Sequence, residues 1–191
     1  MRSTLVCSVF AASFAASPVA HAQSTLAVMG TVEAFDTGSI TVKGEAGAAE
    51  AFKLAPNLIV VQNKPATLND IKANDFVASA AVRKEDGKLY STELRIFPDI
   101  MRGVGEGQRP MNDPRNQTMT NATVTGTVIV GGSNTIKVKF PGGESELIVS
   151  PGVPVTAIVP ADRALVKPGA RVRVQGTKTA DGAVVNRITL Q

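Results

Sequence analysis

Short stretches of alternating apolar and polar residues, bounded by glycine, proline, aspartate or asparagine, run through most of the chain. In the first half this pattern predicts β-strands over residues 26–35, 39–43, 50–54, 76–83 and 88–96. Alternation with a period of two is typical of strands that bury one face. Asp86-Gly87 between the last two strands is a strong hairpin signal. The pattern therefore indicates an all-β fold.

Local signals between the strands add detail to this prediction. The Pro56-Asn57 pair is expected to end the third strand, because both residues favour turns. Residues 67–72 are expected to form a single helical turn capped by Thr67 or Asn69. Residues 160–166 occupy the same place in the second half of the chain. Each half is thus expected to have five strands, with a short turn between the third and the fourth.

The second half of the chain repeats the first. At an offset of 96 residues, Gly-Thr-Val at 30–32 matches Gly-Thr-Val at 126–128. At an offset of 95, Asp-Gly at 86–87 matches Asp-Gly at 181–182. Matches that keep their order along both halves indicate an internal duplication. We assign the first copy to residues 23–97 and the second to residues 122–191.

Five strands with a short turn between the third and the fourth follow the order of an OB-fold, a small Greek-key barrel. We therefore expect two tandem five-stranded OB-like barrels, each made by one copy of the repeat. The strand spacing also allows another small barrel, or an arrangement in which the two copies exchange strands.

Residues 98–121, which we call the linker, separate the two copies. Glycines alternate with other residues at its centre, and prolines follow them; these are Gly103, Gly105, Gly107, Pro110 and Pro114. Since apolar residues do not recur here with the period of a strand or of a helix, we expect neither element. A glycine-rich stretch binds phosphate when it leads into a helix N-terminus, and no helical pattern follows. The linker is thus interpreted as a flexible connector.

The first 22 residues have the pattern of a signal peptide. Arg2 precedes an uncharged apolar run, and Ala20-His21-Ala22 predicts cleavage before Gln23. Cys7 lacks the preceding residues that a lipoprotein site needs. Since no later stretch approaches the roughly 20 consecutive apolar residues of a transmembrane helix, the mature chain is expected in the periplasm or secreted.

Cleavage would remove the only cysteine and the only histidine, and would lower the formal charge from +4 to +3 by loss of Arg2. A serine or cysteine hydrolase needs a base that is usually histidine, and zinc enzymes draw on histidine, cysteine and carboxylate ligands. The remaining carboxylates are scattered along the chain. The sequence therefore favours a non-enzymatic protein, for which no cofactor is expected.

One hairpin combines an aromatic residue with basic residues, as nucleic-acid sites on OB barrels do. Tyr90 lies near Lys88, with Arg83 and Lys84 across the predicted turn. Charges of both signs surround it, which is typical of a solvated hairpin tip. No nucleic-acid partner is expected.

The repeated pattern resembles small bacterial exported β-barrel domains of unknown function. It consists of G-T-V, a strand hairpin, a Leu-x-Asp-Ile-Lys-type turn and a D-G hairpin. The linker sequence RGVGEGQRPM, followed by MTNATV, resembles a set of exported two-repeat proteins often labelled as metal transporter permeases. The resemblance covers nearly the whole mature chain and implies a fold more than a function. A permease needs several transmembrane helices, and the sequence predicts none.

Two functions remain open. The first is a binding or interaction module for a protein, glycan or small molecule, with its cleft beside the linker; its candidate residues are Arg102, Gly103, Gly105, Glu106, Gly107 and Arg109. The second is copper handling by linker thioethers, which are soft ligands that suit Cu(I); its candidate residues are Met101, Met111 and Met119. The same methionines can instead pack against the barrels.

Overall fold

The computed structural model describes residues 24–130, 133–179 and 182–191. The predicted signal peptide, residues 1–22, lies outside them. The described chain is all-β, and its regular elements are the twelve strands of one continuous sheet and three short 3-10 helices. No helix among these residues is both long enough and apolar enough to cross a membrane.

The elements have the following bounds. The strands are β1 (Ser24–Phe35), β2 (Ser39–Gly44), β3 (Ala49–Ala66), β4 (Phe76–Arg83), β5 (Leu89–Phe97), β6 (Gly107–Pro110), β7 (Thr118–Val130), β8 (Ser133–Phe140), β9 (Gly143–Val149), β10 (Val155–Pro160), β11 (Arg171–Thr179) and β12 (Gly182–Leu190). The 3-10 helices are η1 (Leu68–Asp70), η2 (Asp99–Met101) and η3 (Arg163–Leu165).

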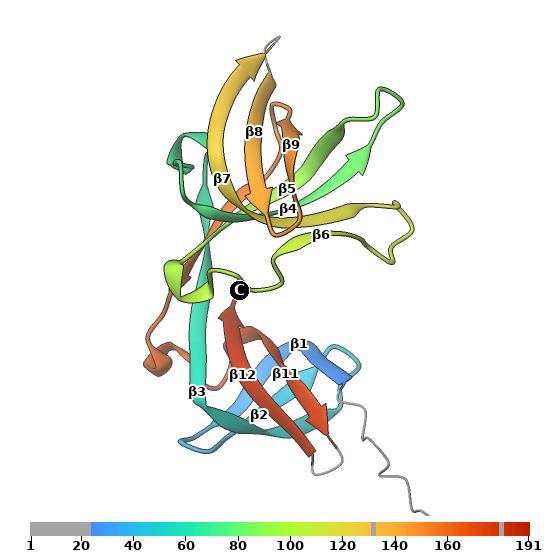
Figure 1. The fold of residues 1–191 in the computed structure, drawn as a ribbon. Coiled ribbons are helices and arrows are strands. Elements are labelled where there is room, and N and C mark those ends of the chain that lie inside the picture. The colour runs from blue at the N-terminus through green and yellow to red at the C-terminus, as the bar shows by residue number, and fades with distance from the viewer. Residues whose placement is uncertain (1–23, 131–132, 180–181) are drawn as a thin grey trace, which may run out of the picture.

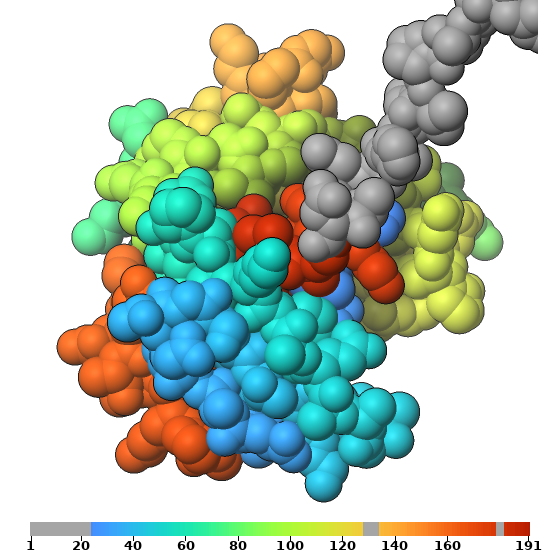
Figure 2. All heavy atoms as spheres, turned by 90° about the horizontal axis from the view of Figure 1, so that it is seen from below, coloured from blue at the N-terminus to red at the C-terminus, as the bar shows by residue number. Residues whose placement is uncertain are grey.

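Five strands from the two ends of the described chain close into a ring that we call the terminal barrel. β1 pairs with β2, and β2 with β3, both antiparallel. β3 then pairs in parallel with β12, and β12 and β11 lead back to β1 by antiparallel pairing. Figure 2, seen from below, shows the blue N-terminal strands packed beside the cyan β3 segment and the orange-to-red C-terminal strands.

Five strands from the middle of the chain close into a second ring, which we call the central barrel. β7 pairs with β8 and β8 with β9, both antiparallel. β9 pairs in parallel with β5, and β5 and β4 lead back to β7 by antiparallel pairing. The order of antiparallel and parallel pairings is therefore the same in both barrels. Figure 1 shows the central barrel above the terminal barrel.

The two halves of the chain exchange strands. The first half gives β1, β2 and the first part of β3 to the terminal barrel, but β4 and β5 to the central barrel. The second half gives β7, β8 and β9 to the central barrel, and β11 and β12 to the terminal barrel. Residues 23–97 and 122–191 therefore do not correspond to the two rings. The pairings follow the exchange alternative that the strand spacing left open.

β3 is much longer than the sequence predicts, and the expectation that Pro56-Asn57 ends it is wrong. Pro56 lies where the pairing of β3 with β12 is irregular, between Leu54 opposite Val185 and Ile59 opposite Arg187. Because the regular ladder is interrupted there, the missing N–H of proline costs no ladder hydrogen bond. The chain thus continues as a strand toward the central barrel.

The second part of β3 connects the barrels. It pairs antiparallel with β10, and β10 pairs in parallel with β5 of the central barrel. A small apolar cluster, with Val61, Met101 and Ile158 buried at its centre, packs beside this connection. Sheet hydrogen bonds and buried side chains therefore link the two barrels.

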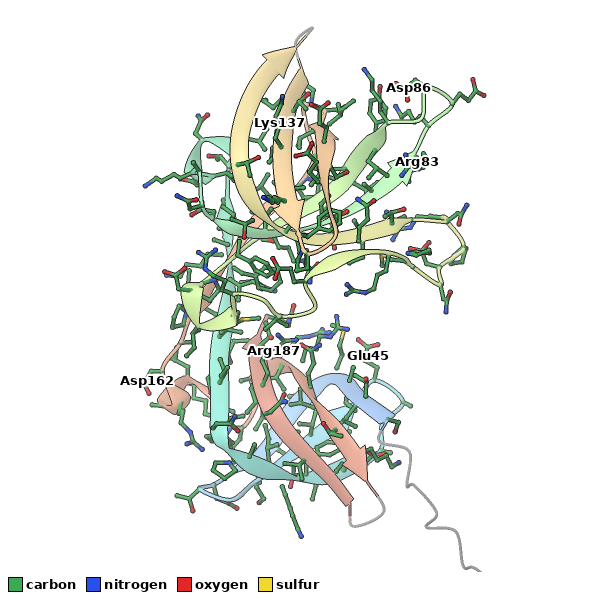
Figure 3. The ribbon with its side chains drawn as sticks, viewed as in Figure 1. Glu45, Arg83, Asp86, Lys137, Asp162 and Arg187 are labelled. Carbon is green, nitrogen blue, oxygen red and sulfur yellow. The ribbon has the colours of Figure 1, made fainter. Side chains whose placement is uncertain are left out.

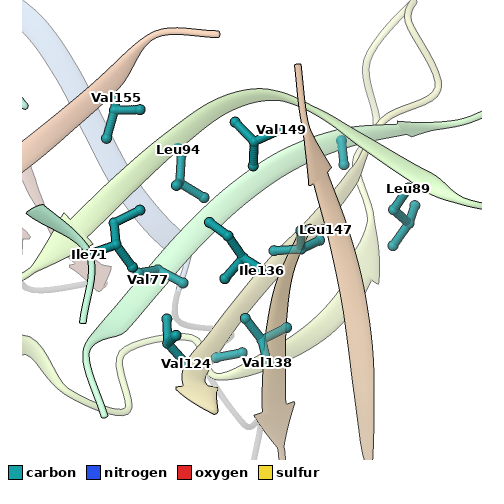
Figure 4. Packing of buried hydrophobic residues seen from close by; sticks show 12 residues of the cluster. Ile71, Val77, Leu89, Leu94, Val124, Ile136, Val138, Leu147, Val149 and Val155 are labelled. Carbon is teal, nitrogen blue, oxygen red and sulfur yellow. The ribbon is translucent and has the colours of Figure 1, made fainter. Parts of the chain in front are cut away.

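Each barrel has its own core. In the central barrel, Val77, Leu94, Ile136 and Leu147 lie in one cluster of buried apolar side chains, which Figure 4 shows. The terminal barrel buries a separate set, which includes Val32, Ile40 and Ile188. Both clusters combine side chains from the two halves of the sequence, so the strand exchange is built into both cores.

The linker is more ordered than the sequence predicts. It contains η2 and β6, and β7 begins at Thr118 inside it. β6 pairs antiparallel with β7, from Gly107 opposite Asn121 to Pro110 opposite Thr118. The expectation of neither strand nor helix is wrong, because this segment lies along an existing strand and gains backbone hydrogen bonds there.

The predicted helical turn over residues 67–72 is confirmed as η1, with Thr67 as its N-cap residue. The backbone N–H and the hydroxyl of Thr67 both donate to a carboxylate oxygen of Asp70, each at 2.8 Å. These bonds hold the pKa of Asp70 below its ordinary value. The equivalent turn of the second half is η3, where Asp162 accepts from the backbone N–H of Ala164.

Gly30 provides a test of the close packing between β1 and β2. A Cβ atom at this position of β1 would lie 2.2 Å from the carbonyl oxygen of Lys43, whereas one at Gly126, the matching position in the second half, has no neighbour within 4 Å. We expect Gly30→Ala to lower the free energy of unfolding by about 1–3 kcal/mol, as overpacking does. Gly126→Ala should change it by less than about 0.5 kcal/mol. Urea denaturation of the two variants checks this, and equal effects would contradict it.

The strand exchange also predicts which fragments fold alone. Residues 66–156 contain all five strands of the central barrel, whereas residues 24–97 contain a complete set for neither barrel. We expect the fragment 66–156 to unfold cooperatively on heating and the fragment 24–97 to show no cooperative transition as a monomer, since unpaired strands are not stable alone. Circular dichroism measures both. A cooperative transition in monomeric 24–97 would contradict the exchange.

Candidate functional site

The turn between β8 and β9 builds one wall of a groove on the central barrel. Gly142 has a φ of +87°, which glycine adopts without strain and which closes the turn tightly. Gly143 leaves room for the ring of Phe140, since a Cβ there would lie 3.2 Å from the ring. Phe140 also packs against the central core. The ring is therefore held in place while part of it stays exposed.

The groove has a volume of about 720 Å³ and lies on the outside of the central barrel. Val124 and Val138 of the same strands are buried in the core, so their neighbours point outward. Glu106 of the linker also lines the groove. The lining residues are Asn74, Glu106, Thr123, Thr125, Lys139, Phe140, Pro141, Gly142, Gly143 and Glu144.

Asn74 is fixed at the rim by backbone hydrogen bonds to β7. Its N–H donates to the carbonyl of Val124 at 2.8 Å, and the N–H of Val124 donates to the carbonyl of Asp75 at the same distance. Asn74 has a φ of +73°, which asparagine tolerates better than most residues. The loop before β4 is thus tied to the barrel wall.

The groove offers several kinds of contact. Thr123 and Thr125 supply hydroxyls, Lys139 a cation, and Glu106 and Glu144 carboxylates. The partly exposed ring of Phe140 supplies an apolar surface. Ligand pockets of this size commonly pair apolar walls with a few polar groups. An aromatic face beside hydroxyl, amide and carboxylate groups suits a polar ring such as a sugar.

Of the linker residues predicted as binding residues, the structure brings only Glu106 into the groove. Arg102 instead pairs with the neighbouring Asp99 at 2.7 Å. Arg109 donates from Nη1 to the carbonyl of Gly105 at 2.8 Å. Both guanidinium groups therefore bond within the linker.

The three predicted linker glycines shape the segment. Gly103, Gly105 and Gly107 all have positive φ, at 80°, 59° and 123°. Asn121 of β7 donates from Nδ2 to the carbonyl of Val104 at 2.9 Å, which holds the loop against the barrel. The glycines thus direct the backbone and place Glu106 at the groove.

Gln108 fastens the linker to the central barrel. Its Nε2 lies 3.0 Å from Oγ1 of Thr120 and 3.2 Å from Oγ of Ser145. These hydroxyls come from β7 and β9, two strands of the same barrel. Because this amide bridges them, the linker is fixed beside the groove.

The sequence does not reveal most of the groove, because its lining residues come from four separate segments. The available signal was the alternation in β7 and β8, where Thr123, Thr125 and Lys139 occupy the outward positions. The Phe140-Pro141-Gly142-Gly143 turn was a second signal. Neither signal indicates that the linker contributes Glu106 to the groove.

The predicted copper residues occupy different environments. Met101 is 1% exposed and packs with Val61 and Ile158 between the barrels. Met111 and Met119 are half-buried. Among the described residues there is also no group of three or more His, Cys, Asp or Glu side chains that could hold a metal ion. The burial of Met101 favours the packing interpretation for this side chain.

The polar groups at the tip of the β4–β5 hairpin bond to one another. Tyr90 donates its hydroxyl to Oδ2 of Asp86 at 2.9 Å, and Lys84 Nζ lies 3.8 Å from the centre of the tyrosine ring. Figure 3 shows Asp86 and Arg83 on this projecting hairpin. The bond to Asp86, and then burial, raises the pKa of Tyr90. The ring is thus engaged within its own hairpin.

Comparison of the chain with protein-family models, with curated proteins and with solved structures finds no match.

Tyr90 is the only tyrosine, and the chain has no tryptophan, so its titration can be followed by absorbance without interference. We expect its pKa to lie above the ordinary value of 10.0, because ionisation loses the bond to Asp86 and places two negative charges together. Asp86→Asn should lower it toward that value. A spectrophotometric pH titration of both proteins measures the difference, and identical curves would contradict the hairpin geometry.

Proposed function

We propose that this protein is an exported, non-enzymatic binding module built from two OB-like barrels that arose by duplication. In each ring, the first three strands of one copy of the repeat lie side by side in order. The third of them then pairs in parallel with the last strand of the other copy: β3 with β12 in one ring, and β9 with β5 in the other. A five-stranded Greek-key barrel with a short turn after the third strand has the OB plan. Duplication explains why both rings share this order.

The groove beside Phe140 is the observation that carries the binding function. It joins an aromatic surface to hydroxyl, amide and charged groups in a volume of about 720 Å³. We infer that its ligand is a polar small molecule or a short segment of glycan, with one ring lying against Phe140. The polar groups around the ring would give specificity through hydrogen bonds.

The groove is supported on every side by fixed elements. Gln108 holds the linker to two barrel strands, and the bonded pair of Asn74 and Val124 holds the opposite loop. A site held in place before its ligand arrives loses little conformational entropy on binding. This rigidity supports a ligand-binding role for the groove.

The predicted signal peptide supports export and therefore a ligand of the cell envelope or the surroundings. Copper handling remains the alternative from sequence. We do not adopt it, because Met101 is enclosed by Val61 and Ile158, and freeing its sulfur would disrupt apolar packing between the barrels.

The proposal predicts that ligand affinity depends on Lys139 but not on Lys137. Both lysines are exposed on β8, but Lys139 lines the groove, whereas Lys137 pairs with Glu146 at 3.5 Å. We expect Lys139→Gln and Glu144→Gln each to weaken binding about tenfold, as loss of one charge-assisted hydrogen bond does. Lys137→Gln should change affinity by less than about twofold.

Native mass spectrometry of the mature protein, isolated from its own cell envelope, would first show whether a ligand is retained. A panel of neutral and amino-sugar oligosaccharides is then titrated by NMR, with the three variants compared. A retained ligand, or shifts at the groove whose affinity falls about tenfold in Lys139→Gln and less than about twofold in Lys137→Gln, would support the proposal. A bare mass with no shifts across the panel would refute it.

A further inference from the structure

Two arginines lie close together on the outer surface of the terminal barrel. Val172 and Val174 of β11 are buried in the core, so Arg173 between them points outward. In the pairing of β11 with β12, Arg173 lies opposite Thr189, and Gln175 lies opposite Arg187. Arg173 and Arg187 are therefore diagonal neighbours on adjacent strands. Such neighbours lie about 7–8 Å apart at the backbone, within reach of long side chains.

Gln175 orients Arg187. Its side-chain oxygen accepts from Nε of Arg187 at 3.0 Å and from Nη2 at 2.7 Å. A neutral amide fixes the plane of the guanidinium without cancelling its charge. The remaining N–H donors of the Arg187 guanidinium stay available for a second acceptor.

Neither guanidinium is neutralised by the described part of the chain. The ion pairs of these residues include Arg171 with Glu45 on the same barrel, but none with Arg173 or Arg187. The Nε atom of Arg173 is buried and has no hydrogen-bond acceptor. This surface therefore holds two guanidinium cations and the buried Nε donor of Arg173, and no carboxylate of the described residues pairs with either cation.

The electrostatics agree with this geometry. Burial lowers the pKa of Arg187, and the positive charge of Arg173 lowers it further. The two groups are thus close enough to repel each other in a partly desolvated place, where charge interactions are stronger than in water. Figure 3 shows Arg187 on the side of the terminal barrel that faces the linker strand β6.

We propose that Arg173 and Arg187 bind one oxyanion, such as a phosphate, sulfate or carboxylate group. The anion accepts from the free donors of Arg187 and from the guanidinium of Arg173. Arginine suits this role because its planar fork matches the spacing of oxyanion oxygens. The same anion removes the repulsion between the two cations.

This site is separate from the groove of the proposed function. The groove lies on the central barrel and uses one lysine, whereas the arginine pair lies on the terminal barrel between β11 and β12. Loss of one site therefore leaves the residues of the other unchanged, and an experiment on one does not decide the other.

The test is isothermal titration calorimetry of the mature protein with inorganic phosphate, and separately with acetate, each at constant ionic strength kept with chloride. We expect saturable binding of at least one of them. Tighter binding of phosphate would indicate a tetrahedral oxyanion as the ligand, and tighter binding of acetate a planar carboxylate. Arg173→Met and Arg187→Met should each weaken that binding at least about tenfold. Arg171→Met is the matched control, because Arg171 is exposed on the same strand and paired with Glu45.

Two further measurements guard against a misfolded variant. In chloride alone, Arg173→Met should melt at the same temperature as the unaltered protein or higher, because it removes an uncompensated charge while keeping an apolar stem. Arg187→Lys keeps the positive charge but loses the planar guanidinium with its paired donors, so it should also weaken binding. No binding of phosphate or acetate above chloride would overturn the proposal, as would an equal loss in Arg171→Met or a marked drop in the melting temperature of Arg173→Met.

Discussion

The parallel pairing of β12 with β3 is the contact on which the terminal barrel, and with it the exchange of strands between the two halves, depends. It joins Leu190, near the end of the chain, to Gln62, and closes the terminal barrel. Bringing segments so far apart in sequence together costs chain entropy, which rises slowly with loop length. The buried core of the barrel, drawn from both ends of the chain, offsets that cost. The middle of the chain, which lies between the segments joined in this ring, forms the second ring.

This arrangement fixes the region where the barrels meet. β3 runs on past Pro56 to pair with β10, and β10 pairs with β5, so hydrogen bonds continue from one barrel to the other. The linker has to return along this junction to reach β7. Its strand β6 pairs with β7, and Gln108 bonds to Thr120 of β7 and Ser145 of β9. The wall of the groove that contains Glu106 is therefore a consequence of the strand exchange.

The two proposed sites differ from the hairpin tips and turns in how many of their polar groups are bonded within the protein. Around the hairpin tips and turns, carboxylates such as Asp36 and Asp86 accept from nearby backbone N–H groups, which lowers their pKa values. Such groups stabilise the local turn and are already bonded. Arg173 and Arg187 have no counter-charge among the described residues, although Gln175 accepts from Arg187, and the groove collects side chains that remain at least partly exposed. Polar groups left without internal partners are the ones available to a ligand.

The sequence by itself determined the local structure. Strand positions in the first half, the turn at Thr67 and the hairpin at Asp86-Gly87 follow from alternation and turn chemistry, which act over a few residues. Alternation also shows which face of a strand is buried, but it does not show which strand lies beside it. Only the tertiary structure decided that the halves exchange strands, that β3 continues past Pro56 and that the linker forms β6. The same limit applies to the proposed sites: Glu106 could be selected as a candidate from the linker sequence, whereas Phe140, Arg173 and Arg187 gain their neighbours only when distant strands pair.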